Sequence, residues 1–177
     1  MGKLLEKSLA EAPVIKMGDY NYVVHPITDG IPFVEAALLN EVVEEILKIG
    51  NFDVDYILTA EAMGIPLATA LSLRTGIPFS IIRKRRYGLK GEKEICQKTG
   101  YSSSKMYING LKKGHRVIIV DDMLSTGGTL KAILTNLKEM GVVVQDVVIV
   151  IEKKHAEKPK KEMEKEFNIK IKSLIIY

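Results

Sequence analysis

The chain has 177 residues, of which 46% are hydrophobic and 27% charged, which is typical of a soluble globular protein with one sizeable core. This composition excludes intrinsic disorder, collagen and a coiled coil as the main structure. Apolar runs shorter than about 18 residues exclude a transmembrane helix, and the N-terminus shows no signal peptide. The net charge of +4 is too small to indicate nucleic-acid binding by itself. A single cysteine and three scattered histidines predict neither a disulfide nor a structural zinc site, so we expect a cytoplasmic protein.

The predicted elements alternate between strands and helices along most of the chain. Residues 13–32 are rich in turn-forming and aromatic side chains, and we expect an irregular N-terminal lobe there. Residues 38–47 repeat apolar side chains at helical spacing, and this is the one clear helix predicted within the first fifty residues. The elements expected further along are strand 55–59, helix 65–74, strand 79–82, strand 117–120, helix 130–140, strand 142–151, helix 158–167 and strand 169–177. Between them, residues 83–104 are strongly basic and are expected to form a long loop.

This alternation favours right-handed crossovers between parallel strands. We therefore predict an α/β fold with a central, mostly parallel sheet flanked by helices. With neither an internal repeat nor an interdomain linker in the sequence, we expect a single domain over residues 1–177. A small N-terminal hood is expected over approximately residues 1–33, completed by C-terminal elements.

The most informative stretch is 117–129, Val-Ile-Ile-Val-Asp-Asp-Met-Leu-Ser-Thr-Gly-Gly-Thr. A buried strand is predicted to end in two adjacent carboxylates, Asp121 and Asp122, and a short loop leads from them into a helix. Glycines permit a tight turn, and backbone N–H groups at a helix N-terminus attract anions. The residues expected to cradle a phosphate are Ser125, Thr126, Gly127, Gly128 and Thr129.

Two acids beside a phosphate cradle indicate a sugar phosphate, because carboxylates repel a polyphosphate but accept hydrogen bonds from ribose hydroxyls. The pattern therefore favours a ribose 5-phosphate. The alternative is that the acids cap the helix and the glycines are ordinary turn residues. Competing signatures are absent from the sequence, which has no G-x-x-x-x-G-K-[ST], no G-x-G-x-x-G after the first strand and no G-x-S-x-G.

Four apolar residues, two acids and a short Thr/Gly loop make this stretch resemble the PRPP-binding signature of the type I phosphoribosyltransferases (PRPP is 5-phosphoribosyl 1-pyrophosphate). The resemblance covers nearly the whole chain. Residues 22–28 are similar to the base-recognition segment of adenine and xanthine phosphoribosyltransferases, and 148–153 resemble a strand and Glu-Lys pair of the xanthine enzymes. As a whole, the chain most resembles the archaeal hypoxanthine/guanine phosphoribosyltransferases.

The resemblance implies the type I phosphoribosyltransferase fold and a glycosyltransferase of purine salvage. The implied reaction transfers 5-phosphoribosyl from PRPP to hypoxanthine or guanine, giving IMP or GMP plus pyrophosphate. Mg²⁺ is the implied cofactor, held through PRPP and waters near Asp121 and Asp122 rather than by direct side-chain ligands. The implied partners are PRPP, the purine base and a second copy in a homodimer, with no nucleic acid and no membrane.

The resemblance also assigns roles to residues outside the Thr/Gly loop. The implied catalytic residues are Asp121, Asp122, Arg83 and Lys84. Pyrophosphate would be bound by Ala62, Met63, Gly64, Arg83 and Lys84. A non-proline cis peptide would fall near Ala62–Met63, and the basic segment 84–104 would close over the site. His25 and Lys153 would contact the purine, Lys153 as a donor to O6, although a packed His25 and a solvated Lys153 are alternatives.

Two departures from the family pattern leave the general base open. Ser125 stands where the common hypoxanthine enzymes have an aspartate, and Gly100-Tyr101 stands where adenine enzymes have Glu-Tyr. Water, Glu92, Glu94 or no strong base are the alternatives. The same chemistry on adenine or xanthine is a second candidate function. A non-catalytic PRPP-binding regulator is a third, which the absence of a helix-turn-helix pattern disfavours.

Overall fold

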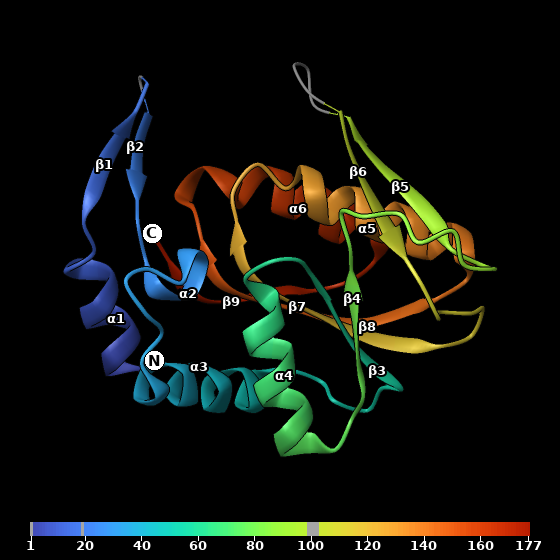
Figure 1. Ribbon diagram of the computed structural model, residues 1–177, viewed down its shortest axis with the longest axis horizontal. Helices are drawn as coiled ribbons and strands as arrows, with labels where there is room; N and C mark the ends of the chain where they lie inside the picture. The colour runs from blue at the N-terminus through green and yellow to red at the C-terminus, as the bar shows by residue number, and fades with distance from the viewer. Residues whose placement is uncertain (1, 19, 99–102) are drawn as a thin grey trace.

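Figure 1 shows the computed structural model, which describes residues 2–18, 20–98 and 103–177. The helices are α1 Lys3–Ala10, α2 Pro26–Asp29, α3 Ala36–Ile49, α4 Gly64–Thr75, α5 Gly128–Met140 and α6 Glu157–Phe167, with a 3-10 helix at Lys154–Ala156. The strands are β1 Val14–Met17, β2 Tyr20–Val23, β3 Tyr56–Ala60, β4 Phe79–Ile82, β5 Lys93–Lys98, β6 Ser103–Ile108, β7 Arg116–Leu124, β8 Val143–Glu152 and β9 Ile171–Ile176. No helix of the described ranges is long and apolar enough to cross a membrane.

Five parallel strands form the central sheet, in the order β4-β3-β7-β8-β9. Successive residues of β7 face opposite sides, so that Ile118 packs in one buried cluster and Val117 and Ile119 in another. The first cluster includes α1, α3 and α4, and the second includes α5 and α6. Helices therefore cover both faces (Figure 1), which confirms the predicted α/β fold with a parallel sheet flanked by helices.

The strand that carries the twin acids is longer than its apolar run. β7 continues through Asp121 and Asp122 to Leu124, and its last residue pairs with Glu152 of β8. Beyond that pair, the N–H of Lys153 donates to the Leu124 carbonyl at 2.8 Å. The prediction that the strand ends at the acids is therefore wrong, because β8 extends far enough to keep pairing with them.

The N-terminal segment contains more regular structure than its sequence pattern indicates. α1 and the short α2 precede α3, and β1 and β2 form an antiparallel hairpin. In α1, Leu5 and Leu9 lie one turn apart and are buried. The side chain of Glu41, in α3, accepts hydrogen bonds from the N–H groups of Leu4 and Leu5 at 3.1 and 2.8 Å. The prediction of one clear helix in the first fifty residues is therefore wrong. The local pattern misses α1 because its first turn is capped by a residue of a distant helix.

The basic segment is also more ordered than expected. β5 and β6 form an antiparallel ribbon that lies beside α5 (Figure 1), with Ile95 opposite Met106. Both side chains are buried in the same cluster as α5. The expected loop over 83–104 is therefore wrong for much of its length, because these side chains anchor the ribbon to the core. The Gly100-Tyr101 pair lies outside the described residues.

Candidate functional site

The carboxyl ends of four neighbouring strands gather the segments that the sequence marks for ligand binding. In a parallel sheet these ends share one edge, where ligands bind. The segments are 61–64 after β3, 83–84 after β4, 125–129 after β7 and 153–155 after β8. Because the strand order is β4-β3-β7-β8, the segment after β3 lies between those after β4 and β7. Of the predicted residues, only His25 comes from the hood instead.

Asp121 and Asp122 are half-buried near the end of β7. The Asp122 N–H donates to Asp121 Oδ1 at 3.1 Å. Burial, together with the neighbouring charge of Asp122, raises the pKa of the Asp121 carboxyl well above its ordinary value. Burial also raises the pKa of Asp122 to about 6. The pair therefore retains protons more readily than two exposed carboxyls would, and each oxygen can accept a hydrogen bond from a ligand hydroxyl.

The predicted phosphate loop encloses a pocket of about 150 Å³. It is lined by Asp121, Met123, Leu124, Ser125, Thr126, Gly127, Gly128, Thr129, Leu130 and Ile149. Gly127 has a φ of 77°, and a Cβ there would lie 3.0 Å from the Met163 Cε. Within the described residues, no side chain caps the start of α5. The first-turn N–H groups of α5 and the loop hydroxyls are therefore available to hydrogen-bond an anion beside a carboxylate.

His155 is a neighbour of this loop that sequence reasoning missed. Its Nε2 lies 3.0 Å from the Ser125 Oγ. It belongs to the 3-10 helix that follows β8, two residues after Lys153. A histidine just beyond the end of a central strand is the signal that could have pointed to it.

The loop after β3 lies directly against the acids. A Cβ on Gly64 would lie 1.8 Å from the Thr59 Oγ1 and 3.0 Å from the Asp121 Oδ1, so a larger residue there would displace the Thr59 side chain. The Thr59 Oγ1 is buried and has no hydrogen-bond partner among the described residues. Thr59 is thus a second residue that sequence reasoning missed. The non-proline cis peptide bond joins Glu61 and Ala62, one residue before its expected place.

Arg83 and Lys84 follow β4 and contact the loop after β3. The Arg83 Nε lies 2.8 Å from the Glu61 Oε2, and the Lys84 N–H donates to the Glu61 Oε1 at 2.7 Å. The Lys84 side chain is exposed. The structure therefore brings both predicted cations next to the loop that contains Ala62, Met63 and Gly64.

The two predicted purine contacts differ in their surroundings. Lys153 is only 8% exposed, and its Nζ lies 4.9 Å from the centre of the Tyr177 ring. Burial lowers the pKa of Lys153, against the opposing effect of the Asp29 charge. Lys153 is thus a largely buried side chain next to the Tyr177 ring, not a solvated one.

His25 is 1% exposed and both ring nitrogens have partners. Its Nδ1 accepts from the Ile27 N–H at 3.2 Å, so the hydrogen lies on Nε2, which is 3.0 Å from the Ser8 Oγ. Burial lowers the pKa of His25, in keeping with this neutral ring. The residue caps α2 and links it to α1.

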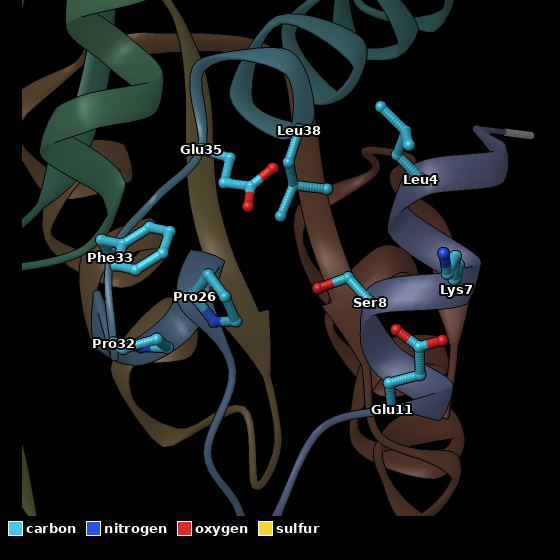
Figure 2. Close-up of a pocket in the computed structure, with 9 residues that line it drawn as sticks. All are labelled: Leu4, Lys7, Ser8, Glu11, Pro26, Pro32, Phe33, Glu35 and Leu38. Atoms are coloured by element: carbon cyan, nitrogen blue, oxygen red, sulfur yellow. The ribbon is translucent and has the colours of Figure 1, made fainter.

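A larger pocket, of about 300 Å³, has Ser8 and Pro26 in its lining (Figure 2). One part of its lining comes from α1 and the residue that follows it, namely Leu4, Lys7, Ser8 and Glu11. The other part consists of Pro26, Pro32, Phe33, Glu35 and Leu38. Its lining is mixed apolar and charged, and it does not include the strand-end loops. The pocket therefore belongs to the hood rather than to the anion site.

Glu92 and Glu94, the two carboxylates considered as general bases, both have pKa values below the ordinary value for glutamate. The Asn109 amide and the N–H groups of Tyr87 and Gly88 donate to Glu92 and lower its pKa. The Lys105 ammonium lowers the pKa of Glu94. Both groups are thus weaker bases than ordinary glutamates. Across the described ranges, no group of three or more His, Cys, Asp or Glu side chains is arranged to hold a metal.

The fold is that of an α/β protein, with two acids and a glycine-containing loop at the carboxyl edge of a parallel sheet. Residues 34–175 match the family described as "Phosphoribosyl transferase domain", and the chain belongs to this family. Among relatives, it is 58% identical to the hypoxanthine/guanine phosphoribosyltransferase of Methanocaldococcus infernus over 97% of this chain and 92% of that one. It is 53% identical to the enzyme of the same name from Methanobacterium lacus, over 99% and 90% of the two chains.

The fold is similar to that of solved adenine phosphoribosyltransferases. The structure from Thermoanaerobacter pseudethanolicus superposes with a TM-score of 0.78 at 23% identity, covering 98% of this chain and 99% of that one. The structure from Trypanosoma brucei, in complex with AMP, pyrophosphate and ribose-5-phosphate, superposes with a TM-score of 0.78 at 15% identity. It covers 98% of this chain and 80% of that one. At these identities the similarity concerns the fold alone. The predicted family membership and fold are confirmed.

Proposed function

We propose that this protein transfers 5-phosphoribosyl from PRPP to hypoxanthine or guanine, which yields IMP or GMP and releases pyrophosphate. The observation that carries the proposal is the pocket formed by residues 125–129 next to Asp121, in a chain 58% identical to a hypoxanthine/guanine phosphoribosyltransferase. The loop would bind the 5′-phosphate through its N–H and hydroxyl groups. Asp121 and Asp122 would accept hydrogen bonds from the ribose hydroxyls.

The charges at the site suit the bond that this reaction breaks. When the C1–O bond lengthens, positive charge develops on the ribose ring and negative charge on the departing pyrophosphate. Asp121 and Asp122 would stabilise the ring. Arg83, Lys84 and the amides of residues 62–64 would stabilise pyrophosphate. Segment 84–104 would exclude water, which otherwise hydrolyses PRPP.

Mg²⁺ fits the groups that the protein presents here. Asp121, Asp122 and the Thr59 hydroxyl, which has no hydrogen-bond partner among the described residues, lie near the same edge of the sheet. This set of oxygens suits Mg²⁺, a hard cation that keeps several of its waters and takes further oxygen ligands from the enzyme's substrate. Asp121 and Asp122 would hold the ion through waters and the ribose hydroxyls. When bound, it would supply positive charge beside the departing pyrophosphate.

Lys153 supports the choice of a 6-oxopurine. An ammonium can donate to O6 of hypoxanthine or guanine, whereas adenine presents an amino group at that position. His25 would act indirectly, by holding α2 and α1 together behind the base, because its ring nitrogens already bond Ile27 and Ser8. We extend the proposal to a cytoplasmic homodimer of single-domain subunits, in which the hood over residues 1–33 borders the base site.

The test is to supply the protein with PRPP, Mg²⁺ and one of adenine, hypoxanthine, guanine, xanthine or orotate, and to measure pyrophosphate release. Release with hypoxanthine and guanine is expected. Asp122→Ala should keep the circular dichroism spectrum and lose turnover. Release mainly with adenine or xanthine would replace the proposed base, and PRPP binding without release with any base would indicate a regulator.

A further inference from the structure

Glu61 lies at the junction between the loop after β3 and the basic segment after β4. Its N–H donates to the Ile82 carbonyl at 3.0 Å, which continues the pairing of β3 with β4 by one residue. Its side chain is only 18% exposed. A carboxylate in this place would repel pyrophosphate unless a cation compensates it, so its presence beside the anion-binding loop needs a physical reason.

The Glu61 carboxylate bridges two consecutive residues. One oxygen lies 2.8 Å from the Arg83 Nε, and the other accepts from the Lys84 N–H at 2.7 Å. The backbone of Arg83 is held separately, since its N–H and carbonyl both bond Tyr107 of β6 at 3.0 and 2.7 Å. Arg83 is thus fixed through its main chain by the ribbon and through its side chain by Glu61.

The contact uses the inner edge of the guanidinium. The Arg83 Nε is buried, while the side chain as a whole is 39% exposed. The Nε–H is not aligned for a hydrogen bond, so the contact with Glu61 is an ion pair. Four of the five guanidinium hydrogens are on the two Nη atoms, and these form the fork that grips two phosphate oxygens. Because Glu61 holds the Nε edge, the protein rather than the solvent sets the direction of the two Nη groups.

We propose that Glu61 is a positioning residue of the pyrophosphate site, which orients the Arg83 guanidinium and fixes the turn at Lys84. This inference rests on the proposed function and adds to it the residue that sets the position of Arg83. It acts on pyrophosphate only through Arg83 and Lys84. The effect of its removal must therefore depend on whether Arg83 is present.

The experiment compares Glu61→Gln, Arg83→Met and the double variant by initial-rate kinetics with PRPP and hypoxanthine. Glutamine keeps an acceptor for the Lys84 N–H but removes the charge that holds Arg83. Glu44→Gln is the matched control, because Glu44 forms an exposed ion pair with Arg74 at 2.5 Å and is not part of the site. Binding of magnesium pyrophosphate is measured on the same proteins by calorimetry, and melting temperatures confirm folding.

Glu61→Gln should raise KM for PRPP and weaken magnesium pyrophosphate binding about tenfold each, equivalent to roughly 1.4 kcal/mol, with KM for hypoxanthine within twofold of the starting protein. In the Arg83→Met background the same change should have no further effect. If the glutamine variant fails to fold, Glu61→Ala replaces it; because alanine also removes the acceptor for the Lys84 N–H, its effect in the Arg83→Met background should be smaller than in the presence of Arg83 rather than zero.

A KM for PRPP within twofold of the starting protein, or effects of Glu61 and Arg83 that simply add, would overturn the positioning role. Failure of the proposed function is seen separately, as no pyrophosphate release by the unmodified protein with any base.

Discussion

Replacing Asp122 by asparagine should stabilise the folded protein at neutral pH while it abolishes turnover. Burial raises the pKa of Asp122 from the ordinary 3.8 to about 6, so the ionised carboxylate is less favourable in the folded chain than in the unfolded one. At about 1.4 kcal/mol for each pKa unit, the difference amounts to roughly 3 kcal/mol at pH 7. Asparagine has nearly the same shape and carries no charge, so up to this amount should be recovered.

The pH dependence follows from the direction of the shift. Because the folded chain holds this proton more tightly, the contribution of Asp122 to stability is complete below about pH 3.8 and is lost as the pH rises toward 6. The advantage of Asp122→Asn should therefore be absent near pH 4 and complete by pH 7. Asp121 strengthens the trend, because burial, together with the charge of Asp122, raises its pKa as well.

Asp29→Asn is the matched control and should behave in the opposite way. Burial of Asp29 raises its pKa, but hydrogen bonds from the His25 N–H, the Thr28 hydroxyl and the Tyr22 hydroxyl outweigh burial and lower it overall. Its charge is thus favourable in the folded chain. Asp29→Asn should destabilise the protein at pH 7, and this loss should fade as the pH falls below the ordinary value for aspartate.

The assay is urea unfolding followed by circular dichroism from about pH 3 to pH 8, with ¹³C NMR of aspartate carboxyl carbons as a direct titration. One carboxyl should titrate near pH 6 and should vanish in the Asp122→Asn spectrum. Equal or lower stability of Asp122→Asn at pH 7, or a stability gap that does not change with pH, would refute the reasoning about buried charge at this strand end.

Three further outcomes are expected. Thr126→Asp should weaken ribose 5-phosphate binding at least tenfold by calorimetry, because it adds a negative charge to the phosphate loop, whereas Thr126→Asn should lose much less; equal losses would argue against the anion site. Lys153→Ala should lower kcat/KM for hypoxanthine and guanine about tenfold more than for adenine, as expected for a lost donor to O6, and equal losses for all bases would remove its proposed role. Gly64→Ala should lower the melting temperature, because its Cβ would lie 1.8 Å from the Thr59 Oγ1. Adding Thr59→Ala should restore part of the loss, and no recovery would show that the backbone, not this hydroxyl, sets the limit.

The sequence predicts elements well where the determinants are local. The strand at 79–82 is found as predicted, and α5 runs from Gly128 to Met140 where residues 130–140 were expected to be helical. In α5 the apolar face and the closing Gly141, with a φ of 69°, both lie within the helix or next to it. α1 and the β5-β6 ribbon are missed, because Glu41 caps the first and the core anchors the second. Neither contact can be read from a local pattern.

The same distinction applies to the site. Residues 121–129 are continuous in sequence, so their spacing predicts the acid pair and the anion loop, and the structure places Asp121 and residues 123–129 around one pocket. Thr59, Glu61 and His155 belong to segments that meet this loop or its neighbours only across strand ends. The order of the strands in the sheet determines which of these segments are in contact, and a single sequence does not give that order directly.

Strand order also explains how acids and anion-binding groups coexist at one edge of the sheet. The loop after β3 lies between Asp121 on one side and Arg83 on the other. Pyrophosphate alone would meet the repulsion of Asp121 as well as the attraction of Arg83, whose ion pair with Glu61 compensates the charge of that carboxylate. A ligand that also has ribose hydroxyls would donate hydrogen bonds to the carboxylates, which would offset their repulsion of its phosphates. For the proposed reaction, this arrangement would favour the sugar pyrophosphate over free pyrophosphate, which would ease release of pyrophosphate once the ribose has been transferred.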